Sequence, residues 1–535
     1  MNEIETGIET EIETEVVVVG AGPTGLAVAG ELALAGVQAV VLEQLAQRVE
    51  QVKGGGIQAR TAELLELRGL LEPLLARSFP RSAVGGHFGA LPVPLDGTVW
   101  NTRHPYPVGV PQWVVEEVLE ERASALGVRI LRGSNVFGVD VDVDADDGVM
   151  VEAGTSNEAG GVLRVRARYL VACDGGHSTV RKLLGVPFPG RSGTRPAVLT
   201  DISLSAVSAL VPREAGHIST LMRHANGYWA MLVPVGGDRY RFTFGPLDPG
   251  PQERDTPVAR EEIAAALEVV YGPETVLDAV ENASRFTDAT RQVEQYRVGR
   301  VLFAGDAAHI HPPLGGQGLN LGIQDAFNLG WKLAATIQDR APDGLLDSYH
   351  VERHPVGAAV LHHTSAQRVL ADPNPSQDVA ALRDIFVELL KLPDANRYLA
   401  GLMSGLSLRY HLPGEHRLVG ERMPDPELVT DAKTVRLSTL MRSGNALVLD
   451  VAGAVPEGIS LPPWVDLVRA TTVDDIGAAV VLIRPDGYVC WATDRSADCG
   501  DALREAIAGR LVLARDAIVP PCHNTSPRCP TGSGT

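Results

Sequence analysis

The first strong pattern along the chain is an apolar run at residues 16–19, which leads directly into a glycine-rich turn. Consecutive β-branched residues are typical of a strand buried on both faces of a parallel sheet. A helical pattern follows over residues 26–35, and Gly36 supplies its C-terminal stop. A second apolar run at residues 38–42 predicts another strand, so this region predicts a strand–helix–strand unit.

The turn of this unit, Gly-Ala-Gly-Pro-Thr-Gly, carries the first candidate chemistry. Gly20 allows the tight turn, Gly22 lets the backbone approach a pyrophosphate, and Gly25 lets the helix pack on the strand. The pyrophosphate would lie on the helix N-terminus, where free N–H groups and the helix dipole favour anions. Glu43, at the tip of the second strand, can accept hydrogen bonds from the ribose hydroxyls and disfavours a 2′-phosphate.

A glycine turn in an unrelated strand–helix–strand unit is the alternative interpretation. The small residue at Ala29, the stop at Gly36 and the terminal acid are all in register with the nucleotide-binding pattern, which favours the ADP half of a dinucleotide other than NADP. The cofactor-binding residues predicted in this unit are Gly20, Gly22, Pro23, Thr24, Gly25, Glu43 and Gln44.

Two later motifs have the same strand–loop–helix form. In the first, a strand beginning at Tyr169 ends in Asp174-Gly175 and leads into a helix. In the second, a strand ends at Gly305-Asp306, and a glycine-rich loop then opens a long helix over residues 320–337. Either motif alone could be an ordinary corner, but the three in this order argue against that interpretation. The resemblance that they carry implies FAD rather than NAD.

These motifs resemble the flavoprotein monooxygenases of the p-hydroxybenzoate hydroxylase type, and within them the bacterial aromatic polyketide hydroxylases. The resemblance implies that Asp306 holds a ribityl hydroxyl of FAD, and that Asp174 and Gly175 serve its pyrophosphate and NAD(P)H. It also implies that the backbone at Gly316, Gly318, Leu319 and Asn320 faces the isoalloxazine. A helix N-terminus there would stabilise the anion of reduced flavin.

The resemblance extends to further residues and shows two departures. It implies that Arg60 and Gln112 touch FAD, that Val136 lies against the adenine, and that Pro313 lies by the flavin near the bound ring, as the candidate catalytic residue. The residue after Glu43 is usually Arg in the family but is Gln44 here. The family Arg that precedes a mobile glycine segment is Lys53 in this chain. Lysine keeps the charge but lacks the planar fork of arginine, so flavin movement or NADPH affinity can differ here.

The sequence contains only one such nucleotide-binding unit. Flavoenzymes that bind two dinucleotides have a second unit and an FxGxxxH motif, and we find neither in this sequence. The WxWxIP motif of flavin halogenases is also missing. His309 and His311 flank the glycine-rich loop, but no third residue with metal-ligand spacing is visible, so we interpret them as shaping the backbone and predict no metal site.

Residues 181–284 show short alternating segments, which predict an antiparallel sheet. The resemblance implies that this sheet covers the flavin and lines the substrate cavity, with Phe88, Met231 and Phe242 as candidate substrate contacts. Each of these three side chains could equally be core. Strand patterns near residues 447–450 and 480–491 belong to a C-terminal unit, for which the resemblance implies a thioredoxin-like fold without a CxxC motif.

The predicted fold class is α/β (α+β overall), with a Rossmann-like FAD domain, an antiparallel-sheet substrate domain and a C-terminal thioredoxin-like domain. The FAD domain is discontinuous, and each domain is predicted with definite limits. These are residues 15–80, 103–180 and 285–398 for the FAD domain, 81–102 and 181–284 for the substrate domain, and 399–520 for the thioredoxin-like domain. The Glu-rich residues 1–14 and the tail 521–535 are predicted to be disordered.

Composition narrows the possible partners. The net charge of −19 argues against nucleic acid and against an anionic membrane surface. No apolar run reaches transmembrane length, the N-terminus is acidic, and five cysteines without a CxxC motif form no disulfide framework. We therefore expect a cytoplasmic protein, monomeric or homodimeric.

Together these features predict an FAD- and NADPH-dependent monooxygenase that hydroxylates a polycyclic aromatic polyketide in antibiotic biosynthesis. The resemblance implies that NADPH binds transiently and reduces FAD, and that O₂ then forms a flavin C4a-hydroperoxide that oxidises the ring. The cofactor would carry this chemistry, and the protein would supply orientation and a dry pocket. Two alternatives remain: Baeyer–Villiger insertion or ring rearrangement by the same intermediate, and a non-catalytic binding protein on a flavoprotein fold.

Overall fold

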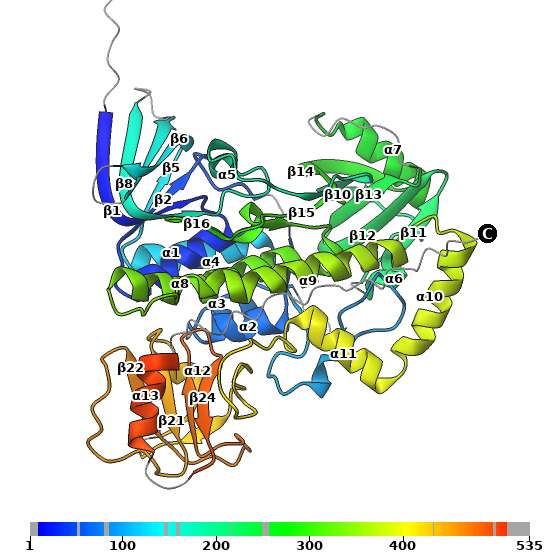
Figure 1. The fold of residues 1–535 in the computed structure, drawn as a ribbon. Helices are drawn as coiled ribbons and strands as arrows, with labels where there is room; N and C mark the ends of the chain where they lie inside the picture. The colour runs from blue at the N-terminus through cyan, green and yellow to red at the C-terminus, as the bar shows by residue number, and fades with distance from the viewer. Residues whose placement is uncertain are drawn as a thin grey trace, which may run out of the picture.

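The computed structural model describes residues 9–50, 54–79, 85–143, 148–156, 161–214, 216–248, 256–431, 433–495 and 499–510. Figure 1 shows a large sheet with helices below it, a second sheet beside it, and a smaller C-terminal unit on the far side of the helices. The long helices α8 (Gln317–Ile337) and α9 (Ser348–Leu370) run through the middle of the molecule.

The large sheet has the order β16-β17-β8-β1-β2-β5, and β7 branches from this order by pairing with both β8 and β6. Strands β17, β8, β1, β2 and β5 are parallel neighbours, and the apolar residues of β17, β8, β1 and β2 are buried in the main core. The strands are β1 Glu9–Val19, β2 Ala39–Glu43, β5 Arg129–Arg132, β6 Ser134–Val143, β7 Gly148–Thr155, β8 Val162–Ala172, β16 Arg297–Val298 and β17 Val301–Phe303. The adjoining helices are α1 Pro23–Leu34, α4 Gln112–Ala125 and α5 Thr179–Leu183.

The first strand corrects the prediction for the acidic N-terminal region. Strand β1 begins at Glu9, and its residues 9–14 pair in parallel with residues 162–167 of β8. Ile12 is buried in this extension, so the segment has a packing face that its glutamates obscured. The prediction of disorder is therefore wrong for residues 9–14, while residues 1–8 and 521–535 lie outside the described residues.

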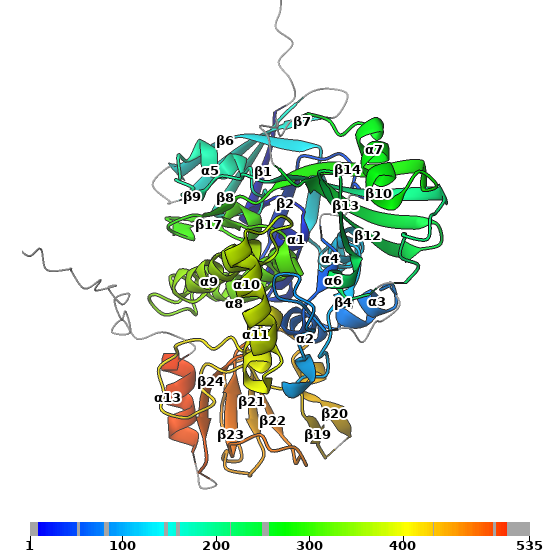
Figure 2. The ribbon, with the colours of Figure 1, turned by 90° about the vertical axis from the view of Figure 1, so that its right-hand side faces the viewer.

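The second sheet is antiparallel and has the order β11-β12-β13-β10-β14. Its strands are β10 Pro196–Ala206, β11 Met222–Ala225, β12 Tyr228–Gly236, β13 Arg239–Pro246 and β14 Val276–Thr287. Helix α7 (Arg260–Tyr271) packs on one face and closes a separate apolar core. The opposite face is turned toward the large sheet and the helices (Figure 2).

The C-terminal unit has a four-stranded sheet in the order β22-β21-β23-β24, in which only the β21–β22 pair is parallel. Its elements are β19 Glu427–Val429, β20 Thr434–Arg436, α12 Leu437–Leu440, β21 Ala446–Asp450, β22 Val465–Arg469, β23 Val480–Ile483, β24 Val489–Thr493 and α13 Gly500–Arg510. Helices α10 (Gln377–Leu390) and α11 (Pro393–Ser404) lead the chain from α9 to this unit.

The remaining elements are short and include a three-stranded sheet, β18-β15-β9, and the strand pair β3–β4. They are β3 Gly56–Ile57, α2 Ala59–Glu66, α3 Leu71–Leu75, η1 Gly97–Val99, β4 Val108–Gly109, β9 Gly190–Arg191, α6 Ile218–Leu221, β15 Thr290–Gln292, η2 Gly305–Ala307, β18 His309–Ile310 and η3 Leu314–Gly316. The predicted fold class is confirmed. Within the described part of the chain, no helix combines the length and apolar composition needed to cross a membrane.

Candidate cofactor and active site

The three sequence motifs meet at one edge of the large sheet, because β1, β8 and β17 are parallel and end side by side. A Cβ atom on Gly20 would lie 2.4 Å from the carbonyl oxygen of Cys173, next to Asp174. A Cβ atom on Gly25 would lie 2.0 Å from the carbonyl oxygen of Gly20. These glycines are therefore required by close backbone contact, as the nucleotide-binding pattern predicts.

Thr24 connects the first motif to the third. Cβ atoms on Gly305 and Gly322 would lie 2.6 and 2.3 Å from its Oγ1 atom, so the hydroxyl is packed between η2 and α8. Helix α1 begins at Pro23 and helix α8 at Gln317, slightly earlier than the sequence predicted. Both helix N-termini thereby reach the same cavity and favour negative charge there.

The carboxylate of Glu43 stands at the end of β2 and is buried. Its Oε2 atom accepts a hydrogen bond from the Ala21 N–H at 2.8 Å, and Oε1 accepts one from Leu45 at 2.9 Å. Carboxylate oxygens accept more than one hydrogen bond. Glu43 therefore fixes the turn after β1 and still has lone pairs for ribose hydroxyls.

A buried ionic cluster supports the Gly305–Asp306 turn from behind. Asp325 of α8 accepts hydrogen bonds from the Gly305 N–H at 3.2 Å, from His309 Nε2 at 2.7 Å and from Arg353 Nε at 2.7 Å. Burial alone would raise the pKa of Asp325, but Arg353 and His309 hold it below its usual value. His309 thus helps to hold the backbone of the Gly305–Asp306 turn through Asp325. The described residues contain no cluster of side chains suited to a metal ion.

The loop that opens α8 is held by Asn320. Gly315 and Gly316 have φ values of 76° and 62°, a conformation that favours glycine. The Asn320 side chain accepts a hydrogen bond from the Gln58 N–H at 2.7 Å and donates to the carbonyls of Gly56 and Gly316 at 2.9 and 2.8 Å. The side chain is 1% exposed, so it positions the loop rather than lining the cavity.

The cavity at this edge brings together most of the predicted cofactor-binding residues. Those that line it are Gly20, Gly22, Pro23, Thr24, Glu43, Gln44, Gln112, Val136, Asp174, Gly175, Asp306, Pro313, Gly316, Gly318 and Leu319. Gly25 and Asn320 lie directly behind this lining, and Lys53 lies outside the described residues. Their roles toward a bound cofactor stay predictions.

The structure corrects the prediction for Arg60. Its guanidinium is 1% exposed, donates to Glu63 at 3.0 Å and to the Asp486 carbonyl at 2.8 Å, and lies 4.6 Å from the ring centre of Tyr488. Asp486 and Tyr488 belong to the C-terminal unit, so this arginine ties α2 to that unit instead of facing the cavity. The side chain of Arg60 therefore lies at the junction with the C-terminal unit.

Two of the three candidate substrate contacts are core residues. Phe242 is fully buried, stacks on Phe244 with ring centres 4.7 Å apart, and faces Tyr271 of α7. Phe88 is 4% exposed and stacks on Phe386 of α10. Met231 is half-buried and alternates with the buried Leu232, so it faces away from the α7 core. Only Met231 remains a candidate substrate contact.

Sequence reasoning missed a polar group on that same sheet face. The Arg241 guanidinium lies against Gly55, 2.6 Å from where a Cβ atom would stand, and Gly55 lines the cavity. Arg241 Nε donates to Asp201 Oδ1 at 3.0 Å, and Asn282 donates to Asp201 Oδ2 at 3.3 Å. The signal was a single arginine between the buried aromatic residues of β13, which indicates a charged residue on the opposite face.

His311 is a second polar residue that the sequence prediction did not place in the cavity lining. It lines the cavity beside Pro313, and its Nδ1 atom lies 2.8 Å from the Pro312 carbonyl. Burial lowers its pKa to about 4, so the ring is neutral at neutral pH. Its buried Nε2 atom has no hydrogen-bond partner among the described residues.

The cavity has the features that FAD requires. A Cβ atom on Gly22 would meet no atom within 4 Å, which leaves room for a phosphate to approach the backbone. The buried Oδ1 atom of Asp174 has no partner among the described residues, although Oδ2 accepts a hydrogen bond from the Val180 N–H at 3.0 Å. Two helix N-termini, the carboxylate of Glu43 for ribose hydroxyls, and the unpartnered Asp174 Oδ1 atom therefore suit an extended dinucleotide.

Comparison with known proteins supports this assignment. Residues 13–364 match the FAD binding domain family, and residues 416–511 match the aromatic-ring hydroxylase C-terminal family. The chain is similar in structure to the OxyS anhydrotetracycline hydroxylase from Streptomyces rimosus, with a TM-score of 0.82, 42% identity, and coverage of 94% of this chain and 100% of that one.

Three curated relatives are similar over most of their length. A 12-dehydrotetracycline 5-monooxygenase/anhydrotetracycline 6-monooxygenase from Streptomyces rimosus is 46% identical and covers 89% of this chain and 95% of its own. A rifampicin monooxygenase from Streptomyces venezuelae is 41% identical, with the same coverage. A dialkyldecalin synthase from Streptomyces rugosporus is 37% identical, again with 89% and 95% covered. The chain belongs to the FAD-dependent aromatic polyketide hydroxylases, a family of flavoprotein monooxygenases.

Proposed function

We propose that this monooxygenase uses FAD, NADPH and O₂ to hydroxylate a polycyclic aromatic polyketide. The observation that carries the proposal is the contact of Arg241 with Gly55, because it places the open face of the second sheet against the cofactor cavity. A ring bound between that face and the loop at Pro313 would lie beside the isoalloxazine. Bound FAD would accept hydride from NADPH and activate O₂ for transfer to the ring.

The chain's own residues would orient and stabilise this chemistry. The N-terminus of α8, held by Asn320, would favour negative charge on the reduced isoalloxazine. His311 is neutral and has a free Nε2 atom, so it can exchange a hydrogen bond with a ring hydroxyl or with the flavin edge. Met231 and its neighbours on the sheet face would exclude water.

The proposal for NADPH follows from the nucleotide site. Glu43 disfavours a 2′-phosphate in the main site, so NADPH would bind elsewhere and only during flavin reduction. The relatives named for tetracycline precursors support a polyketide substrate of several fused rings. They make anhydrotetracycline a suitable first compound to test.

A second candidate has specific support. One relative is named for rifampicin oxidation and another is named as a synthase, so family membership leaves the outcome of the reaction open. Baeyer–Villiger insertion or an oxidative rearrangement at the same site is therefore the alternative to hydroxylation.

The test is incubation of the purified protein with anhydrotetracycline and related polyketides, NADPH and ¹⁸O₂, followed by mass spectrometry. We expect a yellow protein whose NADPH oxidation depends on the polyketide, and one labelled oxygen on an intact ring system. Label in a lactone or a rearranged skeleton would replace hydroxylation with the second candidate. A colourless protein with no flavin absorbance after addition of FAD would overturn the proposal in favour of a binding protein.

A further inference from the structure

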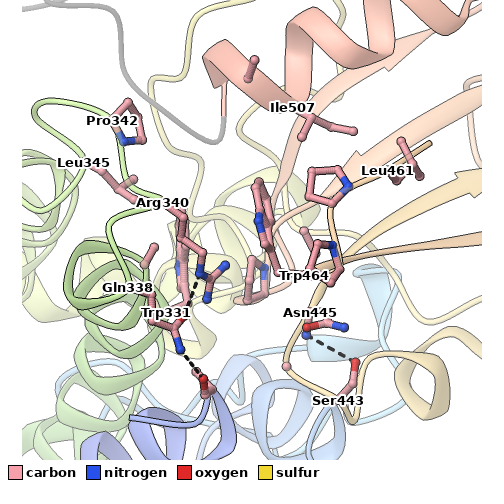
Figure 3. Close-up of a pocket in the computed structure, with 18 of the residues that line it drawn as sticks. Trp331, Gln338, Arg340, Pro342, Leu345, Ser443, Asn445, Leu461, Trp464 and Ile507 are labelled. Carbon is pink, nitrogen blue, oxygen red and sulfur yellow. Dashed lines mark hydrogen bonds between the residues drawn. The ribbon is translucent and has the colours of Figure 1, made fainter. Parts of the chain in front are cut away.

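A second cavity, which we call the junction cavity, lies between the FAD-binding part and the C-terminal unit, away from the cofactor cavity at Gly20 and Asp306. It has a volume of about 690 Å³ and is bounded by the end of α8, the loop after it, the loops before β21 and β22, and α13. Figure 3 shows side chains from both parts of the molecule pointing into it. This volume lies within the range of small-molecule binding pockets.

The walls of the junction cavity are mainly apolar and include two indoles. Trp331 of α8 and Trp464 come from opposite sides, and Leu345, Leu461 and Ile507 complete the surface. Flat rings and proline faces at residues 462, 463 and 485 suit a planar aromatic guest better than an aliphatic chain. The shape therefore indicates an aromatic ligand.

Arg340 supplies a charge that the protein does not neutralise there. Its Nε atom donates to Gln338 Oε1 at 2.7 Å, and its guanidinium carbon lies 5.3 Å from the Trp464 ring centre. No carboxylate among the described residues lies within ion-pair distance of it. Glu31 also lines the cavity, but its carboxylate is occupied by Arg68 at 2.7 Å. Burial lowers the pKa of Arg340, the response of a cation that lacks a counterion.

Trp331 provides an independent sign of a missing partner. The residue is 8% exposed, and its Nε1 atom has no hydrogen-bond acceptor in the part of the chain that the structure describes. The Arg484 guanidinium lies 5.1 Å from its ring centre. A buried indole N–H usually has an acceptor. We therefore expect a ligand in the cavity, or a water molecule bound with that ligand, to accept from Trp331.

We infer that the junction cavity binds a planar aromatic anion, such as an aromatic carboxylate or phenolate. The aromatic body would lie among Trp331, Trp464 and Leu461, and the anionic oxygens would take the free donors of Arg340. Guanidinium groups bind carboxylates with two parallel hydrogen bonds, and partial burial strengthens such a pair. This inference does not rest on the proposed reaction, because the cavity shares no lining residue with the cofactor cavity.

The test uses the full-length, FAD-loaded protein and 2-naphthoate as the probe, with binding measured by calorimetry and tryptophan fluorescence. We expect Arg340→Gln to weaken binding about tenfold or more. The matched control is Arg495→Gln, which removes the same charge from an exposed site on the C-terminal unit, outside the cavity lining, and should leave the affinity unchanged. Uncharged 2-naphthamide should bind wild type about tenfold more weakly than naphthoate, and this difference should disappear in Arg340→Gln.

Two further measurements keep the inference falsifiable. Flavin absorbance near 450 nm distinguishes the sites, because a probe in the junction cavity should leave it unchanged. Naphthoate that perturbs the flavin and binds Arg340→Gln as well as wild type would place the probe in the active site and overturn the inference. A crystal structure with naphthoate should show it beside Arg340, whereas residues 511–535 or a second copy filling the cavity would also overturn it.

Discussion

At the residue scale, Glu43 shows how one side chain serves both fold and ligand. Its two oxygens hold the backbone N–H groups of Ala21 and Leu45, so the carboxylate shapes the turn that a pyrophosphate would use. Its position at the end of β2 also places it where the ribose of a dinucleotide lies. Loss of one oxygen should therefore affect both the turn and the cofactor.

We predict that Glu43→Gln weakens FAD binding by about 10- to 100-fold, because an amide keeps only one acceptor and loses the charge. Hydrogen bonds to a charged group contribute about 1.5–3 kcal/mol each. The measurement is quenching of flavin fluorescence during titration of the apoprotein. Glu72→Gln, at an exposed position of α3, is the control and should bind FAD like wild type. Equal affinities for the two variants would contradict the role of Glu43.

Single residues also show where prediction from sequence fails. The glycines, Glu43 and Asp306 were predictable because backbone spacing alone positions them at strand ends. Arg60 and Phe242 were not, because a side chain's neighbours depend on elements distant in sequence. Arg60 meets Asp486 and Tyr488, more than 400 residues away, and Phe242 lies on the α7 face of its strand.

At the element scale, the packing of α1 on β1 depends on a few backbone contacts. Gly25 and Gly30 lie on the same helix but in different surroundings. A Cβ atom at Gly25 would lie 2.0 Å from the Gly20 carbonyl oxygen, while one at Gly30 would meet nothing within 4 Å. The two positions therefore form a matched pair for testing the close contact of α1 with the turn.

We predict that Gly25→Ala destabilises the protein by about 1–3 kcal/mol and abolishes tight FAD binding, because the helix must move away from the turn. Gly30→Ala should instead stabilise the protein by up to about 1 kcal/mol, since alanine favours helix and has room. Urea denaturation and FAD titration measure both effects. If Gly25→Ala proved as stable as Gly30→Ala, the close contact would not be required.

The strands were easier to predict from sequence where their apolar run was continuous. The pattern at residues 16–19 predicted the buried end of β1, but alternating glutamates concealed its extension to Glu9. Residues 9–14 pair with β8 at the edge of the core, where strand pairing and one buried Ile12 suffice. The glutamates thus predicted solvent exposure of their own side chains but not the strand that contains them.

The use of NADPH, the oligomeric state and the cellular location of the protein stay predictions.

At the scale of the whole molecule, a buried ionic network joins the C-terminal unit to the central helices. Arg484, just after β23, donates to Glu352 Oε1 and Oε2 at 2.9 and 2.8 Å and to Asp486 Oδ1 at 3.0 Å. Lys332 of α8 approaches Glu352 at 2.9 Å. Burial would raise the pKa of Glu352, but Arg484 and Lys332 lower it to about 2. Because these side chains are buried away from water, each charge is stabilised by its opposite partners in the network.

We predict that Arg484→Met destabilises the protein by about 3–5 kcal/mol, because two buried carboxylates would then share a single lysine. The matched control is Arg504→Met on α13, which removes an exposed pair with Asp501 and should cost less than about 1 kcal/mol. Chemical denaturation followed by tryptophan fluorescence compares the two variants. Similar losses for both would show that the junction network contributes no special stability.

Three imidazoles, of which His363 is buried and His87 and His311 are partly buried, make the stability of the molecule depend on pH. Burial lowers the pKa of His87, His311 and His363 from 6.5 to about 4, and His217 adds to the effect on His87. In the unfolded chain these imidazoles take up protons near pH 6.5, while in the fold they stay neutral down to about pH 4. The free energy of unfolding should therefore be highest above pH 6.5 and fall as the pH drops toward 4, by about 1.4 kcal/mol per pH unit for each imidazole. Urea denaturation between pH 8 and pH 5 measures this slope, and His363→Asn should reduce it by one imidazole's share. A free energy of unfolding that stays constant or rises over this range would show that these rings titrate alike in the folded and unfolded chains.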